Sequence, residues 1–217
     1  MPNFLSESAL IRMTTRLGEL VLLNLCFLLC CLPVVTIGAA STALYTVCFH
    51  FDSKQEKTAV TSFFRAFRQN LKQGSLLWLI IGALCAGVCG LVLLFLRASG
   101  VARYGLLPSL VLLLVCLIVA SYTFPLLSLF DNSCGGTLKN ALILGLGNLP
   151  RSVCIVAVNL APLILLLADF MLFLRLSIFL VFLYFSGAAY VNTFLLRKVV
   201  APYLPEEAEE EDNANSK

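Results

Sequence analysis

The sequence predicts an all-α protein that crosses a membrane several times, a polytopic transmembrane helical bundle. Of its 217 residues, 60% are hydrophobic and only 12% are charged, whereas soluble domains are about 45–50% apolar and about 25% charged. The apolar residues also occur in long blocks, and a block of about 20 such residues is long enough for one helical crossing. These observations exclude a soluble globular fold and indicate that lipid surrounds most of the chain.

The first apolar block, residues 17–51, is expected to form a short hairpin with arms at residues 17–32 and 38–50. Between the arms lie Pro33, Thr36 and Gly38. Proline lacks the N–H that a helix interior needs, so the helix should end there. Each arm is shorter than a full crossing, so a double crossing and a single, partly re-entrant crossing both fit.

Residues 54–73 are expected to form an amphipathic basic helix. At 100° per residue, Val60 and Leu71 share an apolar face with three phenylalanines, while the basic residues lie beside and opposite that face. Such a helix suits the membrane interface, where each basic residue near anionic lipid contributes about 1 kcal/mol. Two interpretations remain open, a docking surface for a partner and a lipid-resting linker that orients the next span. The candidate partner-binding or lipid-binding residues are Phe63, Phe64, Arg65, Phe67, Arg68 and Lys72.

Four clearer spans follow at residues 74–96, 104–130, 153–168 and 176–196. Pro125 should kink the second of them, a connector with a short helix occupies residues 131–151, and Asp169 with Arg175 should form a tight turn between the last two spans. Small residues at Gly82, Ala86 and Gly90 should let the first of these spans pack closely on another helix, by default one of the same chain.

The distribution of basic residues predicts six crossings with both termini in the cytoplasm. This layout places twelve Lys and Arg on the inner side and three on the outer side, a strong positive-inside bias. A single crossing at the start would give ten against five. The start imitates a secretory signal, but the apolar run resumes after it, and we expect no cleavage. Residues 1–204 then form the membrane domain, and residues 205–217 an acidic, disordered cytoplasmic tail.

Polar residues inside the spans form a second candidate site. Asn24 and Asn159 should hydrogen-bond across helices, since a buried amide in lipid needs a partner. They could instead line a polar path. With Pro33, Thr36 and Gly38 they make up the candidate intramembrane polar and hinge residues. Near the interface, Glu19 should pair with Arg16 three residues earlier.

The sequence predicts no catalytic, cofactor or metal site. There is a single histidine, and the nine cysteines lie mostly inside apolar runs, where they are expected to act as small packing residues. The absence of acidic or basic residues in mid-span also counts against a proton-coupled carrier. Basic residues lie at the ends of apolar blocks rather than on one soluble face, which argues against nucleic-acid binding.

Two motifs resemble the YesL-like family of bacterial multi-pass membrane proteins, a domain of unknown function. The first motif runs from Asn24 through residues 32–40 (LPVVTIGAA) to residues 42–45 (TALY), and the second is SFFRAFRQNLKQ at residues 62–73. The resemblance implies a protein of the bacterial plasma membrane that works with carbohydrate ABC-type transport systems. It supplies no catalytic or ligand-binding residues.

We therefore expect an accessory or regulatory membrane component without catalytic activity. Its partners would be the lipid bilayer and either ABC-type transporter subunits or further copies of itself, with no nucleic acid and no cofactor. The alternative is a small-solute carrier in its own right, because interrupted helices often build substrate sites. An intramembrane enzyme that uses Asn24 or His50 is the third possibility.

Overall fold

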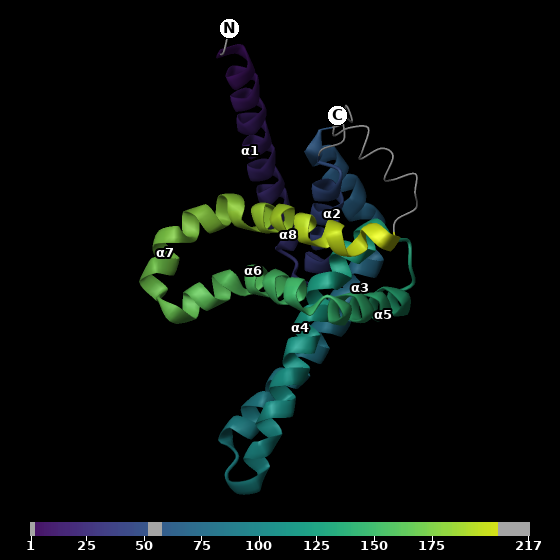
Figure 1. Cartoon of the computed structure of the whole chain (residues 1–217), viewed down its shortest axis with the longest axis vertical. Helices are drawn as coiled ribbons and strands as arrows, with labels where there is room; N and C mark the ends of the chain where they lie inside the picture. Colours follow the sequence, from purple (N-terminus) through teal and green to yellow (C-terminus); the bar gives the residue numbers. More distant parts are fainter. Residues whose placement is uncertain (1–2, 52–57, 204–217) are drawn as a thin grey trace.

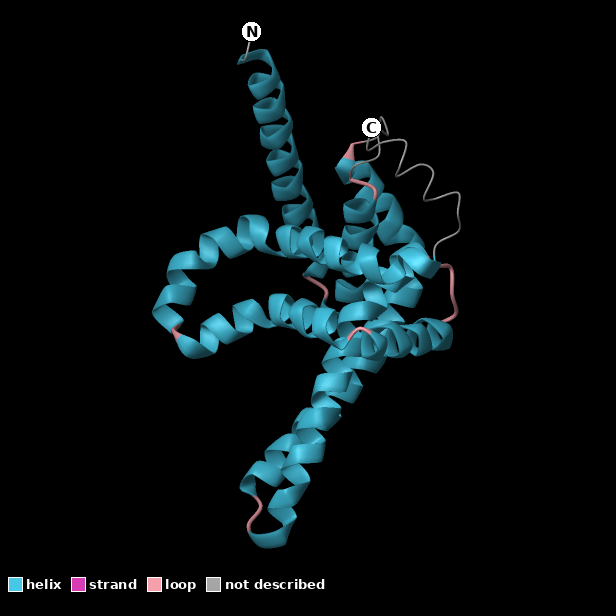
Figure 2. Ribbon diagram, in the orientation of Figure 1, coloured by secondary structure: helices cyan, strands magenta, loops and turns pink. Residues whose placement is uncertain are grey.

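The structure, a computed structural model, describes residues 3–51 and 58–203, with side chains placed from residue 14 onward apart from Ala102. Within these ranges every regular element is helical, which confirms the all-α prediction (Figures 1 and 2). The predicted acidic tail at residues 205–217 lies outside the described residues.

Eight α-helices make up the described part of the chain. They are α1 (Asn3–Cys31), α2 (Ile37–Phe49), α3 (Ala59–Arg97), α4 (Leu106–Leu129), α5 (Cys134–Gly147), α6 (Leu149–Ala168), α7 (Phe170–Phe179) and α8 (Phe185–Val200). Short helical segments connect them, namely η1 (Val34–Thr36), η2 (Gly100–Gly105), the π-helical η3 (Leu180–Tyr184) and η4 (Ala201–Tyr203).

Five helical stretches of the described chain are long and apolar enough to cross a membrane, as expected of a membrane protein. They are Thr14–Cys31, Ala59–Arg97, Arg103–Leu129, Leu149–Ala168 and Phe170–Tyr203. The sixth predicted segment, residues 38–50, corresponds to α2, which has 13 residues. At 1.5 Å per residue α2 extends about 20 Å, well short of the roughly 30 Å hydrocarbon core.

The predicted helix break after residue 31 is confirmed. Helix α1 ends at Cys31, and Pro33 precedes the single turn η1. The hydroxyl of Thr36 lies 2.6 Å from the carbonyl oxygen of Cys30 and 2.7 Å from that of Pro33. The carbonyl of Pro33 already accepts from the N–H of Thr36. The hydroxyl of Thr36 therefore supplies a donor to the carbonyl of Cys30, in the last turn of α1, where the helix itself offers no N–H partner.

Gly38, which the sequence predicts to be a hinge residue, lies at a helix crossing in the structure. It is the second residue of α2, and a Cβ atom there would lie 2.2 Å from the carbonyl oxygen of Gly74 in α3. A Cβ on Gly74 would in turn lie 2.8 Å from the Cα of Ala39. The α2 and α3 backbones thus touch at a point where only glycine fits.

The prediction of a separate amphipathic helix at residues 54–73 is wrong, because residues 59–73 form one continuous helix with the following span. Residues 54–57 of the predicted helix lie outside the described residues. Helix α3 has 39 residues and no interruption near Gly74, so it extends about 58 Å, nearly twice the thickness of a bilayer core. A lone glycine costs a helix only about 1 kcal/mol relative to alanine, and here that glycine also permits close packing on α2.

The small-residue stripe on α3 does not pack on another helix of the described chain, contrary to the expected intramolecular contact. A Cβ atom on Gly82 or Gly90 would meet nothing within 4 Å, and Ala86 is exposed. The buried side chains of this part of α3 are Leu77, Ile81 and Val88. They lie on a different face of the helix, and that face takes the packing contacts.

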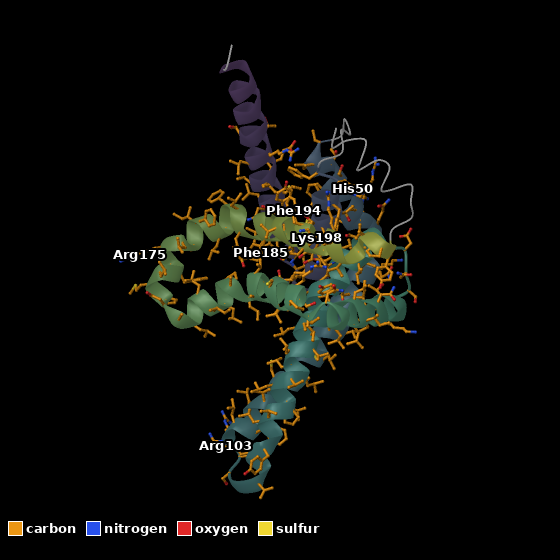
Figure 3. All side chains as sticks on the ribbon, in the orientation of Figure 1. His50, Arg103, Arg175, Phe185, Phe194 and Lys198 are labelled. Atoms are coloured by element: carbon orange, nitrogen blue, oxygen red, sulfur yellow. The ribbon has the colours of Figure 1, made fainter. Side chains whose placement is uncertain are left out.

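Helices α6 and α8 lie across the direction of the α3–α4 hairpin, and α7 joins them at one end (Figure 1). Arg103 marks the far end of the α3–α4 hairpin, whereas Arg175 lies on α7 (Figure 3). Of the turn predicted at Asp169 and Arg175, only Asp169 takes part. Its carboxylate oxygen accepts from the N–H groups of Met171 and Leu172 at 2.9 and 3.0 Å. The common core lies where α2 meets α1, α3, α4 and α8, and α4 in turn packs on α5 and α6.

Candidate functional site

A polar cleft opens between α1, the end of α2 and the first half of α3. It has a volume of about 320 Å³, at the lower end of the roughly 300–1,000 Å³ of small-molecule sites. One face of α3 contributes Ser62, Arg65 and Gln69, which share that face because they are three and four residues apart. The remaining lining residues are Glu19, Thr46, Val47, His50, Phe51, Ala59 and Ala66.

Two of the polar groups at the cleft have partners within α2. The hydroxyl of Thr46 donates to the carbonyl oxygen of Thr42 at 2.9 Å. The Nδ1 atom of His50 lies 2.8 Å from the carbonyl oxygen of Thr46. Because a carbonyl oxygen can only accept, Nδ1 carries the proton in this contact.

Four other polar side chains face the cleft with their hydrogen-bonding capacity unused. In the part of the chain that the structure describes, neither the carboxylate of Glu19 nor the side chains of Ser62, Arg65 and Gln69 have a hydrogen-bond or ion-pair partner. Glu19 and Arg65 therefore bring opposite charges to one cleft without pairing. The groups converge from α1 and α3, which are distant in sequence.

The predicted ion pair between Arg16 and Glu19 is not formed. The guanidinium of Arg16 lies over the ring of Phe51, 5.9 Å from the ring centroid. This distance is within the range of a cation–π contact. Phe51, at the end of the α1–α2 hairpin, thus contacts α1 through Arg16, and Glu19 lines the cleft.

The candidate docking residues on α3 divide into a buried and an exposed set. Phe63 is fully buried, with its ring stacked on that of Phe67 at 6.4 Å between centroids, so Phe63 contacts neither lipid nor partner. Phe67 is half-buried. The exposed members are Phe64, Arg65, Arg68 and Lys72.

The predicted hydrogen bonds of Asn24 across helices are confirmed. Its Oδ1 atom accepts from the backbone N–H of Ser186 at 2.8 Å, and its Nδ2 atom donates to the carbonyl oxygen of Val181 at 2.5 Å. Both partners lie in or just after η3, where the wider π-helical turn interrupts the regular α-helical ladder. The side chain of Asn24 thus gives a hydrogen-bond partner to two backbone groups at that interruption.

Asn159 belongs to a polar chain that links four helices. Its Nδ2 atom donates to the hydroxyl of Ser121 in α4 at 3.1 Å, and its Oδ1 atom accepts from Asn192 of α8 at 2.9 Å. Asn192 also donates to the hydroxyl of Tyr45 in α2 at 3.2 Å. Neither Asn192 nor Tyr45 is among the predicted site residues, although an asparagine within an apolar span is the same signal that identified Asn159.

A third polar cluster joins α4, α5 and α6. The buried hydroxyl of Ser152 lies 2.9 Å from that of Tyr122 and 2.7 Å from the carbonyl oxygen of Gly145. Since a hydroxyl has one proton, both groups are satisfied if Tyr122 donates to Ser152 and Ser152 donates to Gly145. Nothing in the local sequence pattern singles out this serine.

No metal site is found among residues 14–51 and 58–203, where no three His, Cys, Asp or Glu side chains come together to hold an ion. All nine cysteines are free thiols.

Residues 20–95 match the model of a protein family described as "Protein of unknown function, DUF624". This finding agrees with the resemblance to the YesL-like family. The matched segment contains the second part of α1 from residue 20 onward, all of α2 and nearly all of α3, and hence all but Glu19 of the lining of the cleft. Neither a curated protein nor a solved structure matches the chain.

Proposed function

We propose that this chain, a membrane protein whose residues 20–95 match the DUF624 family, is an accessory or regulatory component that docks a partner on the first half of α3. The observation that carries the proposal is the continuity of α3. Its apolar part, residues 74–96, is about 35 Å long and fills a bilayer core. Residues 59–73 add about 22 Å, which project beyond the core as a rigid stalk.

The exposed face of this stalk is cationic. Arg65, Arg68 and Lys72 are exposed, and the described part of the stalk has no acidic residue. Phe64 and Leu71 are exposed on the same stretch, at 42% and 37%. Cations around large apolar side chains favour a partner surface that is acidic at its rim and apolar at its centre.

The transport system is the partner class that the family resemblance implies, with an ABC-type transporter subunit or a second copy of this chain as the candidate partner. The positive-inside bias supports a cytoplasmic position of the stalk, and the family resemblance supports a bacterial cell. In this proposal the chain has no catalytic turnover, no cofactor and no contact with nucleic acid.

Purification from native membranes in a mild detergent tests the proposal. The wild-type chain should recover a defined transporter subunit in fixed proportion, and the double variant Arg68→Glu/Lys72→Glu should lose it. The conservative variant Arg68→Lys/Lys72→Arg is the matched control and should retain the partner. A monodisperse protein without a partner, or equal recovery by the charge-reversed variant, would overturn the proposal.

A small-solute carrier is the second candidate function, and the contact between two irregular segments favours it. Asn24 of α1 binds η3, and η1 breaks the chain just after α1. Broken helices often form substrate sites in carriers. Against this, each polar atom of Asn24 already binds a backbone group and the side chain is fully buried, so a substrate would have to displace these contacts to reach it.

Uptake by liposomes that contain only the purified chain separates the two functions. An accessory component alone should move no solute down a gradient, whatever the solute offered. Uptake that Asn24→Leu abolishes would replace the accessory function with the carrier.

A further inference from the structure

We propose that the cleft between α1, α2 and α3 binds a zwitterion that carries a phosphate next to a primary ammonium, the chemistry of a phosphoethanolamine group. This inference does not depend on the docking function of the stalk. Two sources supply this chemistry, the headgroup of a phospholipid and a soluble phosphoethanolamine.

The charges of the cleft select a zwitterion. Arg65 from α3 and Glu19 from α1 line the same cleft, and neither has a partner among the described residues. A simple anion bound at Arg65 would be repelled by Glu19, and a simple cation bound at Glu19 would be repelled by Arg65. A ligand with one charge of each sign satisfies both side chains at once.

The hydrogen-bonding groups divide in the same way as the charges. The guanidinium of Arg65 is a planar fork of donors that suits phosphate oxygens. The amide of Gln69 and the hydroxyl of Ser62 add donors on the same face of α3. Ionised Glu19 only accepts, and a primary ammonium offers it three N–H donors. The phosphate therefore faces α3 and the ammonium faces α1.

The size and surroundings of the cleft agree with such a ligand. A volume of about 320 Å³ accommodates a small headgroup, and Val47, Phe51 and Ala66 contribute apolar lining. On α1, Leu22 lies three residues after Glu19, on the same side of the helix, and is 52% exposed. It offers apolar surface on which an acyl chain of a bound lipid can lie.

Native mass spectrometry of the full chain in detergent, supplied with defined phospholipids, tests the proposal. Phosphatidylethanolamine should be retained about tenfold more than phosphatidylcholine, whose methylated ammonium cannot donate to Glu19, or phosphatidylglycerol, which has no ammonium. In a second arm, soluble phosphoethanolamine is added without lipid. Binding in either arm supports the shared chemistry and identifies the source.

The variants test which lipid is preferred as well as how strongly each lipid is retained. Glu19→Gln should reverse the preference, so that phosphatidylglycerol is retained more than phosphatidylethanolamine, and a misfolded variant would not show such a gain. Arg65→Gln should lower retention of both lipids by about tenfold. Arg68→Gln removes an exposed cation that does not line the cleft, and it should leave the retention of both lipids unchanged.

Two results would overturn the proposal. One is equal retention of the three phospholipids together with no binding of soluble phosphoethanolamine by the wild-type chain. The other is an equal effect of Arg68→Gln and Arg65→Gln, which would mean that the overall charge of the stalk attracts the ligand. Because partner docking is tested with Arg68 and Lys72, the failure of one proposal leaves the other intact.

Discussion

At the scale of single residues, polar side chains compensate for irregular backbone. Asn24 binds an N–H and a carbonyl group at the π-helical segment η3, and Thr36 donates to carbonyl groups at the break after α1. In lipid no water is available to satisfy such groups, and each unsatisfied group costs several kcal/mol. An irregular helix inside a membrane therefore requires a polar side chain beside it.

The replacement Asn24→Leu should lower the free energy of unfolding by about 1–3 kcal/mol, because two buried backbone groups lose their partner. The measurement is a thermal or denaturant unfolding curve in detergent. Leu29→Ala is the control on the same helix, since Leu29 is 64% exposed, and it should have almost no effect. Equal stability of Asn24→Leu and the wild type would show that η3 is satisfied by other groups.

The replacement Gly38→Ala should destabilise the protein by about 1–3 kcal/mol, because overpacking moves the α2 and α3 backbones apart. The added Cβ atom would lie 2.2 Å from the carbonyl oxygen of Gly74. Gly82→Ala is the matched control, since its Cβ atom meets nothing within 4 Å. It should be neutral or stabilise helix α3 by up to about 1 kcal/mol. The same unfolding measurement serves both variants, and the reverse order would contradict the proposed crossing.

At the scale of an element, α3 combines two roles that the sequence pattern suggested for separate helices. Its first half buries Phe63 and Ala66 in the core and exposes its basic residues, and its second half is apolar on nearly every face. One uninterrupted helix joins the halves, so the helix itself sets how the basic half and the apolar half are oriented relative to each other.

Cysteine accessibility distinguishes a projecting stalk from a helix that lies in the interface. In a cysteine-free background shown to fold, Phe64→Cys should react with a membrane-impermeant thiol reagent in inside-out vesicles, because the stalk exposes residue 64 to water. Leu84→Cys, which is 55% exposed on the apolar half, faces lipid and should not react. In an interfacial helix the apolar face points into the lipid, so protection of Phe64→Cys would contradict the stalk.

At the scale of the whole molecule, long-range polar contacts hold crossed helices together. The chain from Ser121 through Asn159 and Asn192 to Tyr45 connects α4, α6, α8 and α2. The guanidinium of Arg197 near the end of α8 donates to the carbonyl oxygen of Phe49 at the end of α2, at 2.7 Å. Hydrogen bonds between helices are directional, so they set how the helices cross where apolar packing alone would tolerate several arrangements.

Reporter fusions test the predicted sidedness of the whole molecule. A fluorescent protein fused after residue 217 should be bright, because the positive-inside bias places that end in the cytoplasm. A phosphatase that works only outside the cytoplasm should be active when inserted at Gly100, at the tip of the α3–α4 hairpin. Activity of both reporters on one side would mean that α3 does not cross the bilayer.

The sequence alone predicts the features that depend on local chemistry and on the solvent. The apolar blocks predict apolar helices and Pro33 predicts the end of α1, and both lie where expected. Of the turn predicted at Asp169 and Arg175, only the part at Asp169 is found, because Arg175 lies within α7. A missing N–H or a nearby carboxylate acts within one helical turn. Its effect can therefore be predicted without the rest of the fold.

The tertiary structure decides which surfaces meet. Phe63 and Phe64 are adjacent and chemically identical, yet the first is fully buried and the second is 42% exposed. Gly38 and Gly74 become a crossing point, and Glu19 and Arg65 line one cleft, only when three helices come together. The local sequence pattern does not predict these features, because packing depends on residues that are distant in sequence. The free energy of a close contact depends on both surfaces that form it.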